Sequence, residues 1–216
     1  LKKIDGIIFG EDPQQGYVEG NMFYHPQLRF QFPVPSGWQL NNTPSQVQMF
    51  TEKQDAVILF SMASEVSPSA AANAFITNSN ATVKQSEPTR VNSLQAHQVV
   101  SDLTTDQGVI SVSSYFIQKD NKIFIFHGYT GQPQFASYLS SFNQTMGQFK
   151  TLTDSRKINV TPEKLDIKMT QRQGTLKSAL QQFGVPDDKM EMLAIMNGLQ
   201  LSDTVPANTL IKVVVK

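Results

Sequence analysis

The amino-acid sequence predicts an α+β protein: an antiparallel sheet covered by helices, followed by a small strand-helix-helix-strand domain. Between residues 82 and 130, four segments rich in β-branched and aromatic residues are separated by short polar turns, a pattern typical of an antiparallel meander. Residues 68–78 and 133–149 instead repeat their apolar side chains with a helical period. After a polar stretch, residues 165–215 read as strand, helix, helix and strand.

Three parts are expected along the chain. Residues 1–19 carry apolar side chains, but glycine and proline interrupt them too often for a regular element. We interpret them as a lead-in arm, or as a linker from a missing upstream domain. Residues 20–153 form the large α+β domain, and residues 154–216 form a polar linker followed by the small domain.

The large domain opens with residues 20–38, the stretch richest in aromatic side chains. Leu28, Phe30 and Phe32 alternate with polar residues, which predicts a half-buried strand. Asn41 to Ser45 is expected to be a turn, and a short strand is expected near residues 47–51. The nearly continuous apolar run AVILFSM at residues 56–62 indicates a strand inside the sheet.

The first helix of this domain is expected at residues 68–78, because Ser67 can cap it and Pro68 suits its first turn. Four strands should follow, of which the first is polar and therefore an edge strand; they are residues 82–90, 94–103, 109–118 and 122–130. A second helix is expected at residues 133–149. Its apolar residues recur at spacings of four and three, which predicts one buried stripe; they are Phe135, Leu139, Phe142, Met146 and Phe149.

The small domain begins with alternating apolar residues at 165–169, which predict a strand. Thr175 can cap a first helix, and Asp187 or Asp188 can begin a second one that Asn197 and Gly198 end. The apolar residues 210–215 predict the closing strand.

Composition excludes several classes of function. The 18 basic residues balance the 18 acidic ones, so no net charge draws the chain to nucleic acid. No apolar run is long enough for a membrane helix, so membrane insertion is not expected. The absence of cysteine excludes disulfides and thiolate metal sites. Because the chain is rich in uncharged polar residues, we expect an exported or cell-envelope protein.

The residues offer no catalytic constellation. His25, His97 and His127 lack zinc-ligand spacing, and HExxH, GxSxG and phosphate-binding glycine loops do not occur. We interpret the histidines as structural, although His97 and His127 lie in predicted strands and could meet across the sheet. This chain is therefore not expected to be an enzyme or to hold a metal or another cofactor.

Two stretches resemble known families. Residues 5–44, DGIIFGEDPQQGYVEGNMFYHPQLRFQFPVPSGWQLNNTP, are similar to the segment after the catalytic domain of bacterial HtpX/CAAX-prenyl-protease-like zinc metalloproteases. The body of the large domain resembles the PsbP-like fold. This resemblance implies a non-catalytic accessory region, with zinc only in a missing upstream domain. Its partners would be that catalytic domain or another protein.

The small domain resembles a degenerate LysM-like module through Gly174–Leu176, Asn197–Leu199 and the closing LIKVV. LysM modules commonly bind N-acetylglucosamine polymers, so the resemblance implies peptidoglycan as an alternative partner. The glycan site would then comprise Gly174, Thr175, Leu176, Asn197, Gly198 and Leu199. The chain lacks the acid that usually precedes the threonine. In the structural alternative, Thr175 only caps a helix and Asn197 only ends one. A third possibility is a stand-alone PsbP-like binding protein.

Overall fold

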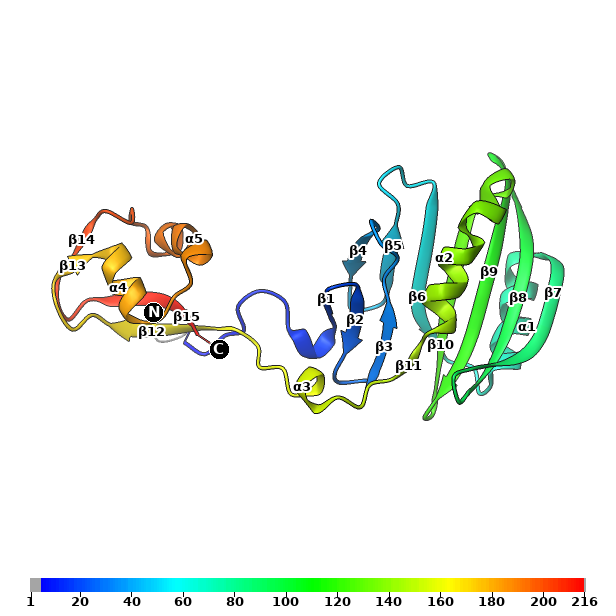
Figure 1. The fold of residues 1–216 in the computed structure, drawn as a ribbon, viewed down its shortest axis with the longest axis horizontal. Helices are drawn as coiled ribbons and strands as arrows, with labels where there is room; N and C mark the ends of the chain where they lie inside the picture. Colours follow the sequence, from blue (N-terminus) through cyan, green and yellow to red (C-terminus); the bar gives the residue numbers. More distant parts are fainter. Residues whose placement is uncertain (1–4, 216) are drawn as a thin grey trace. The chain divides into compact units, whose positions relative to one another are not determined.

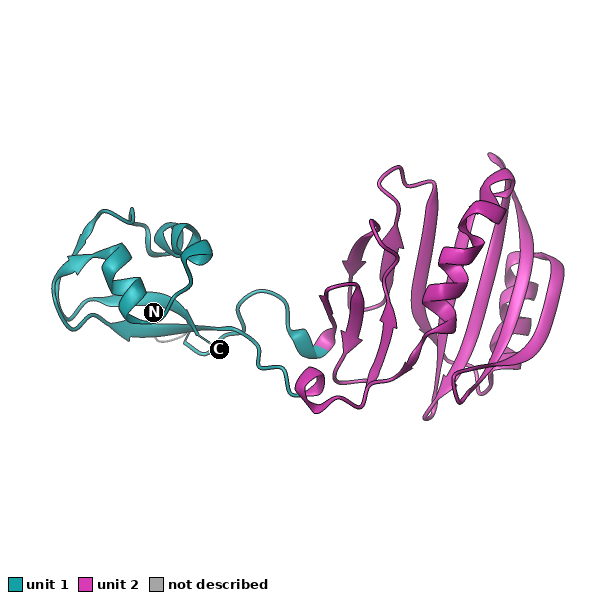
Figure 2. Ribbon diagram, viewed as in Figure 1, with its two compact units in different colours: residues 1–14, 159–216 teal, residues 15–158 magenta. Residues whose placement is uncertain are grey.

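The structure, a computed structural model, describes residues 5–215 and divides the chain into two compact units. The large unit consists of residues 15–158, and the small unit combines the residues up to 14 with those from 159 onward (Figure 2). The boundaries therefore differ from the predicted ones at 19/20 and 153/154. In sequence terms, the large unit is inserted into the small one.

Seven strands of the large unit form one antiparallel sheet (Figure 1). They are β4 (Gln39–Asn42), β5 (Val47–Phe50), β6 (Ala56–Ala63), β7 (Thr82–Val91), β8 (Leu94–Thr105), β9 (Gly108–Lys119) and β10 (Lys122–Gly131). Their order is β4-β5-β6-β10-β9-β8-β7, so the predicted meander from β7 to β10 is confirmed and β7 is an edge strand. β6 lies inside the sheet as predicted, and its partner there is β10.

A second sheet has the order β1-β2-β3-β11, and sequence reasoning did not predict it. Its strands are β1 (Tyr17–Glu19), β2 (Met22–His25), β3 (Phe30–Pro33) and β11 (Lys150–Thr151). β11 lies directly after the helix predicted at residues 133–149, and the short helix α3 (Ser155–Ile158) lies where the linker was expected. The prediction failed there because a two-residue strand carries no periodicity, and its partner β3 is distant in the sequence.

The two long helices of the large unit cover opposite faces of the seven-stranded sheet. α1 (Pro68–Ser79) begins as predicted, with the Ser67 hydroxyl accepting a hydrogen bond from the Ala70 N–H at 3.1 Å. α2 (Phe135–Gly147) follows a single 3-10 turn, η3 (Gln132–Gln134). Neighbouring residues of β10 point to opposite faces: the His127 ring stacks on Phe75 of α1, whereas Gly128 lies against α2.

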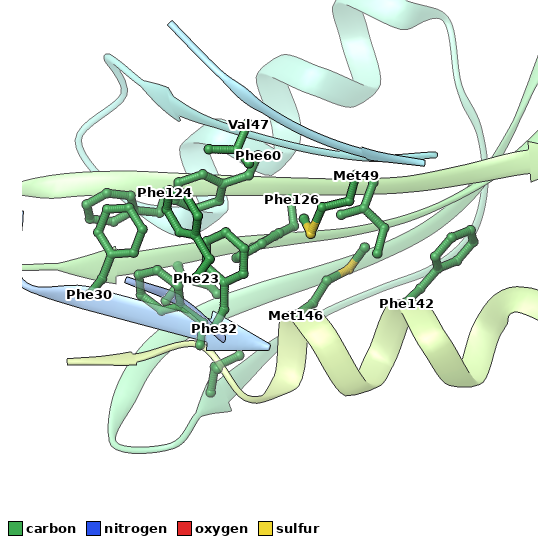
Figure 3. Close-up of a cluster of buried hydrophobic side chains, with 14 of the residues drawn as sticks. Phe23, Phe30, Phe32, Val47, Met49, Phe60, Phe124, Phe126, Phe142 and Met146 are labelled. Carbon is green, nitrogen blue, oxygen red and sulfur yellow. The ribbon is translucent and has the colours of Figure 1, made fainter. Parts of the chain in front are cut away.

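Aromatic side chains fill the space between the two sheets (Figure 3). The Phe32 ring lies 5.2 Å from that of Phe126, and the Phe30 ring lies 5.1 Å from that of Phe124, measured between centroids. The second sheet and α2 therefore cover the same face of the seven-stranded sheet. The sequence had predicted that helices alone would cover the sheet. Phe149 belongs to this core as predicted, although it lies just beyond the end of α2.

The small unit has the predicted order of strand, helix, helix and strand. β12 (Lys164–Met169) pairs antiparallel with β15 (Leu210–Val215). Between them come β13 (Gly174–Thr175), α4 (Leu176–Gln182), α5 (Asp187–Asn197) and β14 (Thr204–Val205), and β13 pairs with β14. Leu176, Leu180, Leu193 and Val213 are fully buried in one core.

The N-terminal arm belongs to the small unit. The Gly6 N–H donates to the Leu165 carbonyl, the Leu165 N–H donates to the Ile7 carbonyl, and both distances are 2.8 Å. Phe9 packs against the core of the small unit. The predicted single lead-in over residues 1–19 is thus divided, because β1 belongs to the large unit. Residues 1–4 of that lead-in lie outside the described residues.

Candidate functional site

A pocket in the large unit, lined by His25 together with several uncharged polar side chains, is the candidate site. Its volume is about 130 Å³, and it lies where the end of β2, the loop after β4 and strand β6 meet. Phe30, Phe60 and Phe124 contribute an apolar lining from three different strands. Met62 also lines the pocket and is 50% exposed.

Hydrogen bonds hold the turn that presents His25. The Leu28 N–H donates to His25 Nδ1 at 3.2 Å, and the Arg29 N–H donates to the Pro26 carbonyl at 3.2 Å. Behind the turn, the buried ammonium of Lys119 donates to the Leu28 carbonyl at 3.1 Å. One wall of the pocket is therefore fixed by the fold and needs no rearrangement to form.

Burial determines the charge of His25. Removal from water disfavours the imidazolium and lowers the pKa of His25 from 6.5 to about 4. The ring is therefore neutral near pH 7. Because Nδ1 accepts the Leu28 N–H, the single ring proton lies on Nε2, which leaves Nε2 as a hydrogen-bond donor.

The rim of the pocket is polar and uncharged. The Gln15 side-chain amide donates to the side-chain oxygen of Gln27 at 2.6 Å. The Asn42 side-chain amide donates to the Gln15 and Gly16 carbonyls at 3.2 and 3.3 Å. Neither an acid nor a basic Lys or Arg is among the residues that line this pocket. An apolar interior with a few fixed polar groups is the usual composition of a small-molecule or side-chain binding site.

His97 and His127 have structural partners. The two ring nitrogens of His97 lie 3.1 and 2.8 Å from the hydroxyls of Ser69 and Ser86. His127 Nδ1 lies 2.8 Å from the hydroxyl of buried Ser114. Burial lowers the pKa of both histidines, that of His127 to about 4. Both rings lie on the α1 face of the sheet, but each contacts its own serines.

The first half of the predicted glycan site is built into the small unit. The Thr175 hydroxyl accepts a hydrogen bond from the Ser178 N–H at 3.2 Å and caps α4. Leu176 is fully buried, and its N–H donates to the Asp203 carbonyl at 2.9 Å. Gly174 pairs with Val205, and a Cβ there would lie 2.7 Å from the Ser178 hydroxyl.

The second half of that site ends α5. The Asn197 side chain donates to the Leu193 and Lys212 carbonyls at 2.8 and 3.0 Å and accepts the Lys212 N–H at 2.8 Å. Gly198 has the left-handed conformation, with φ 69°, that ends the helix. Leu199 packs in the same core as Leu176. The fold thus brings the two leucines together, while the Asn197 amide binds α5 to β15.

Two features are absent from residues 5–215. No group of three histidine or carboxylate side chains there is arranged to hold a metal ion. No helix in the same range is long and apolar enough to cross a membrane.

Sequence reasoning interpreted His25 as structural and missed its pocket. The signal was present in the segment FYHPQLRF, where a histidine stands among aromatic residues and precedes a proline turn. The opposite wall comes from residues 42–47 and 60–62, and nothing local in the sequence shows that these segments meet His25.

Comparison with solved structures identifies the fold of the large domain. Cyanobacterial PsbP (CyanoP) from Synechocystis matches with a TM-score of 0.50 and 12% identity, over 60% of this chain and 91% of that one. This likeness shows a PsbP-like α+β domain. LpqN of Mycobacterium tuberculosis, a protein involved in cell envelope biogenesis, gives a TM-score of 0.44 at 10% identity, over 57% of this chain and 83% of that one. The Saccharomyces cerevisiae Ran-binding protein Mog1p gives a TM-score of 0.42 at 11% identity, over 59% of this chain and 92% of that one.

At these identities the likeness concerns the fold alone. No protein-family model matches the chain, and no curated protein sequence matches it.

Proposed function

We propose that this chain is the non-catalytic accessory region of a bacterial cell-envelope zinc metalloprotease, and that it binds another protein. Its partner would be the catalytic domain upstream or a protein held for that domain. The zinc would belong to that upstream domain, and the location would be the periplasm, the cell envelope or the extracellular medium. The motif at residues 5–44 motivates the assignment to this protease family.

The observation that supports the non-catalytic part is the engagement of His97 and His127 by internal partners. His97 has hydroxyl partners at both ring nitrogens, and His127 is hydrogen-bonded and stacked on Phe75 with centroids 4.6 Å apart. A general base needs a pKa near the working pH and a free nitrogen directed at the substrate. Lowered pKa values and internal partners suit these histidines to packing instead.

Two measurements test this proposal. The coding sequence upstream of the Leu1 codon should encode an export signal and a helix with HExxH. The purified chain should contain no stoichiometric zinc by elemental analysis and should leave casein intact. Zinc at one equivalent together with casein cleavage would overturn the non-catalytic assignment. An upstream sequence without HExxH would overturn the assignment to a protease.

The alternative is a glycan-binding module of the LysM type in the small unit. It is favoured by the strand-helix-helix-strand order and by the β13–β14 pairing, which brings the loop before α4 beside the loop after α5. The test is co-sedimentation of the chain with purified peptidoglycan. Retention that soluble N-acetylglucosamine oligomers compete away would support this alternative, and absence of retention would exclude it.

A further inference from the structure

We propose that the pocket beside His25 binds an uncharged ring of benzene size that carries one hydrogen-bond acceptor. The ring would lie against Met62, over a floor formed by the almost fully buried Phe30, Phe60 and Phe124. Its acceptor would receive the Nε2–H of His25. Such a ring could belong to a tyrosine side chain of a bound polypeptide or to a free phenol. The inference concerns this pocket alone and does not depend on the protease assignment.

The size of the ligand follows from the volume of the pocket. Its roughly 130 Å³ is close to the volume of an engineered apolar cavity of about 150 Å³ that binds benzene. One six-membered ring therefore fills the pocket, and a larger ligand would extend out of its open side. Phe30, Phe60 and Phe124 are 0%, 5% and 1% exposed, so they form only the floor of the pocket. The apolar surface that a guest can cover comes from Leu28 and Met62, and a methionine thioether makes favourable contacts with aromatic rings.

The need for an acceptor follows from the hydrogen bonds of His25. Nδ1 is occupied by the Leu28 N–H, so the one proton of the neutral ring lies on Nε2. A purely apolar guest would remove this donor from water without a partner, which costs binding free energy. A guest with an oxygen acceptor avoids that cost.

The charge of the lining excludes an ionised ligand. His25 is the only titratable side chain among the lining residues. The polar neighbours on the rim are glutamine, asparagine, serine and threonine side chains. A carboxylate in this place would have no cationic partner and would lose its hydration.

The experiment is a titration of the whole chain with p-cresol, toluene and benzoate, observed through the methionine methyl signals by NMR. Met62 lines the pocket and is 50% exposed, whereas Met169 in the small unit is 53% exposed and serves as the matched control. We expect p-cresol to shift the Met62 methyl signal and leave Met169 unchanged. Toluene should bind about 2- to 12-fold more weakly than p-cresol, the range expected for one hydrogen bond.

Two variants of His25 separate its donor from its acceptor. H25N keeps an oxygen near the position of Nδ1 for the Leu28 N–H but removes the donor at Nε2. H25Q keeps a donor near Nε2 and loses the acceptor for Leu28. We expect H25N to bind p-cresol and toluene equally and H25Q to retain the preference for p-cresol. Unchanged Trp38 fluorescence would show that each variant is folded.

The outcomes distinguish the sources of the ring. Binding of p-cresol together with a capped tyrosine peptide indicates a polypeptide side chain, and binding of p-cresol alone indicates a free phenol. Equal affinity for p-cresol and toluene in the unmodified chain would overturn the inference. Tighter binding of benzoate, or equal shifts at Met62 and Met169, would also overturn it. None of these results affects the zinc and casein tests of the proposed function.

Discussion

At the scale of single residues, Gly128 shows how closely α2 approaches the sheet. A Cβ on this residue would lie 2.6 Å from both Phe142 Cγ and Met146 Cε, two fully buried side chains. Its backbone conformation is that of an ordinary strand. Glycine is therefore needed here for lack of space rather than for an unusual φ angle.

We expect Gly128→Ala to lower the free energy of unfolding of the large unit by about 1–3 kcal/mol, because overpacking a filled core forces side chains from their preferred positions. Urea unfolding followed by Trp38 fluorescence measures this, since the only tryptophan packs beside Tyr138 and Phe142. Gly147→Ala is the matched control at the end of α2, where a Cβ meets nothing within 4 Å. A Gly128→Ala protein as stable as the Gly147→Ala protein would contradict the prediction.

The buried ring of His127 should make stability depend on pH. Burial lowers its pKa from 6.5 to about 4, so the folded chain keeps the ring neutral. Below about pH 6.5 the unfolded chain binds a proton that the folded chain does not, and stability falls as the pH falls toward 4. Between pH 7 and pH 5 the loss should be roughly 2 kcal/mol.

Urea unfolding at both pH values, compared with the His127→Asn variant, isolates this contribution from those of His25 and His97. The asparagine side chain cannot take up the proton, so the variant should lose less stability on acidification. Equal losses in the two proteins would show that the His127 pKa is not lowered by folding.

At the scale of secondary-structure elements, short-range hydrogen bonds decide where helices begin. α4 starts at Thr175 because its hydroxyl accepts the Ser178 N–H, and Leu176 then enters the core. The same residue is a candidate for glycan contact. The capping role is visible in the fold, and a glycan-binding role stays a prediction.

We expect Thr175→Ala to destabilise the small unit by about 1 kcal/mol, whereas Thr175→Ser keeps the capping hydroxyl and should stay close to the unmodified chain. Hydrogen exchange at the Leu180 and Leu193 amides, inside α4 and α5, reports on this unit without interference from Trp38 in the large one. Equal exchange rates in the alanine and serine variants would show that the cap contributes little.

At the scale of the whole molecule, the two units differ in the number of chain segments that form them. The large unit is one continuous segment, whereas the small unit needs the arm before it as well as the residues after it. Within the small unit, the Gln14 side-chain amide donates to the Val160 carbonyl at 3.0 Å, so the two points where the chain leaves it are close together. The large unit can therefore be removed without stretching the small one.

We expect a protein in which a short glycine-serine linker replaces residues 15–158 to fold as the small unit. Its NMR signals should superpose on those of the same residues in the full chain. The control begins at residue 159 and lacks the arm, so it loses the pairing with Leu165 and the packing of Phe9. If that control is as stable as the spliced protein, the arm is not part of the small unit's core.

Much of the fold could be predicted because its signals are local. The cap at Ser67, the apolar stripe of α2 and the polar edge strand β7 each depend on residues within a few positions of one another. The small unit could be predicted for the same reason, since Thr175 begins its first helix and Gly198 ends its second. These residues act through short-range hydrogen bonds and backbone conformation, which require no knowledge of distant partners.

The candidate site could not be predicted in the same way. His25, Asn42 and Met62 line one pocket, yet they are far apart in the sequence and no motif connects them. Of the six residues predicted to bind glycan, the structure explains Thr175, Leu176 and Asn197 by capping, burial and internal hydrogen bonds. Whether any of them also contacts a sugar is a matter for the peptidoglycan experiment.

The sequence by itself determined strands β6 to β10, the two long helices of the large unit, the strand-helix-helix-strand order of the small unit, and that the chain carries no net charge. Only the tertiary structure decided that β6 pairs with β10, that a second sheet covers the aromatic face, and that the arm joins β12. The physical reason is the distance along the chain over which each kind of interaction acts. Capping and periodicity act within one or two turns of the chain, whereas strand partners and pockets are selected by packing many distant side chains at once.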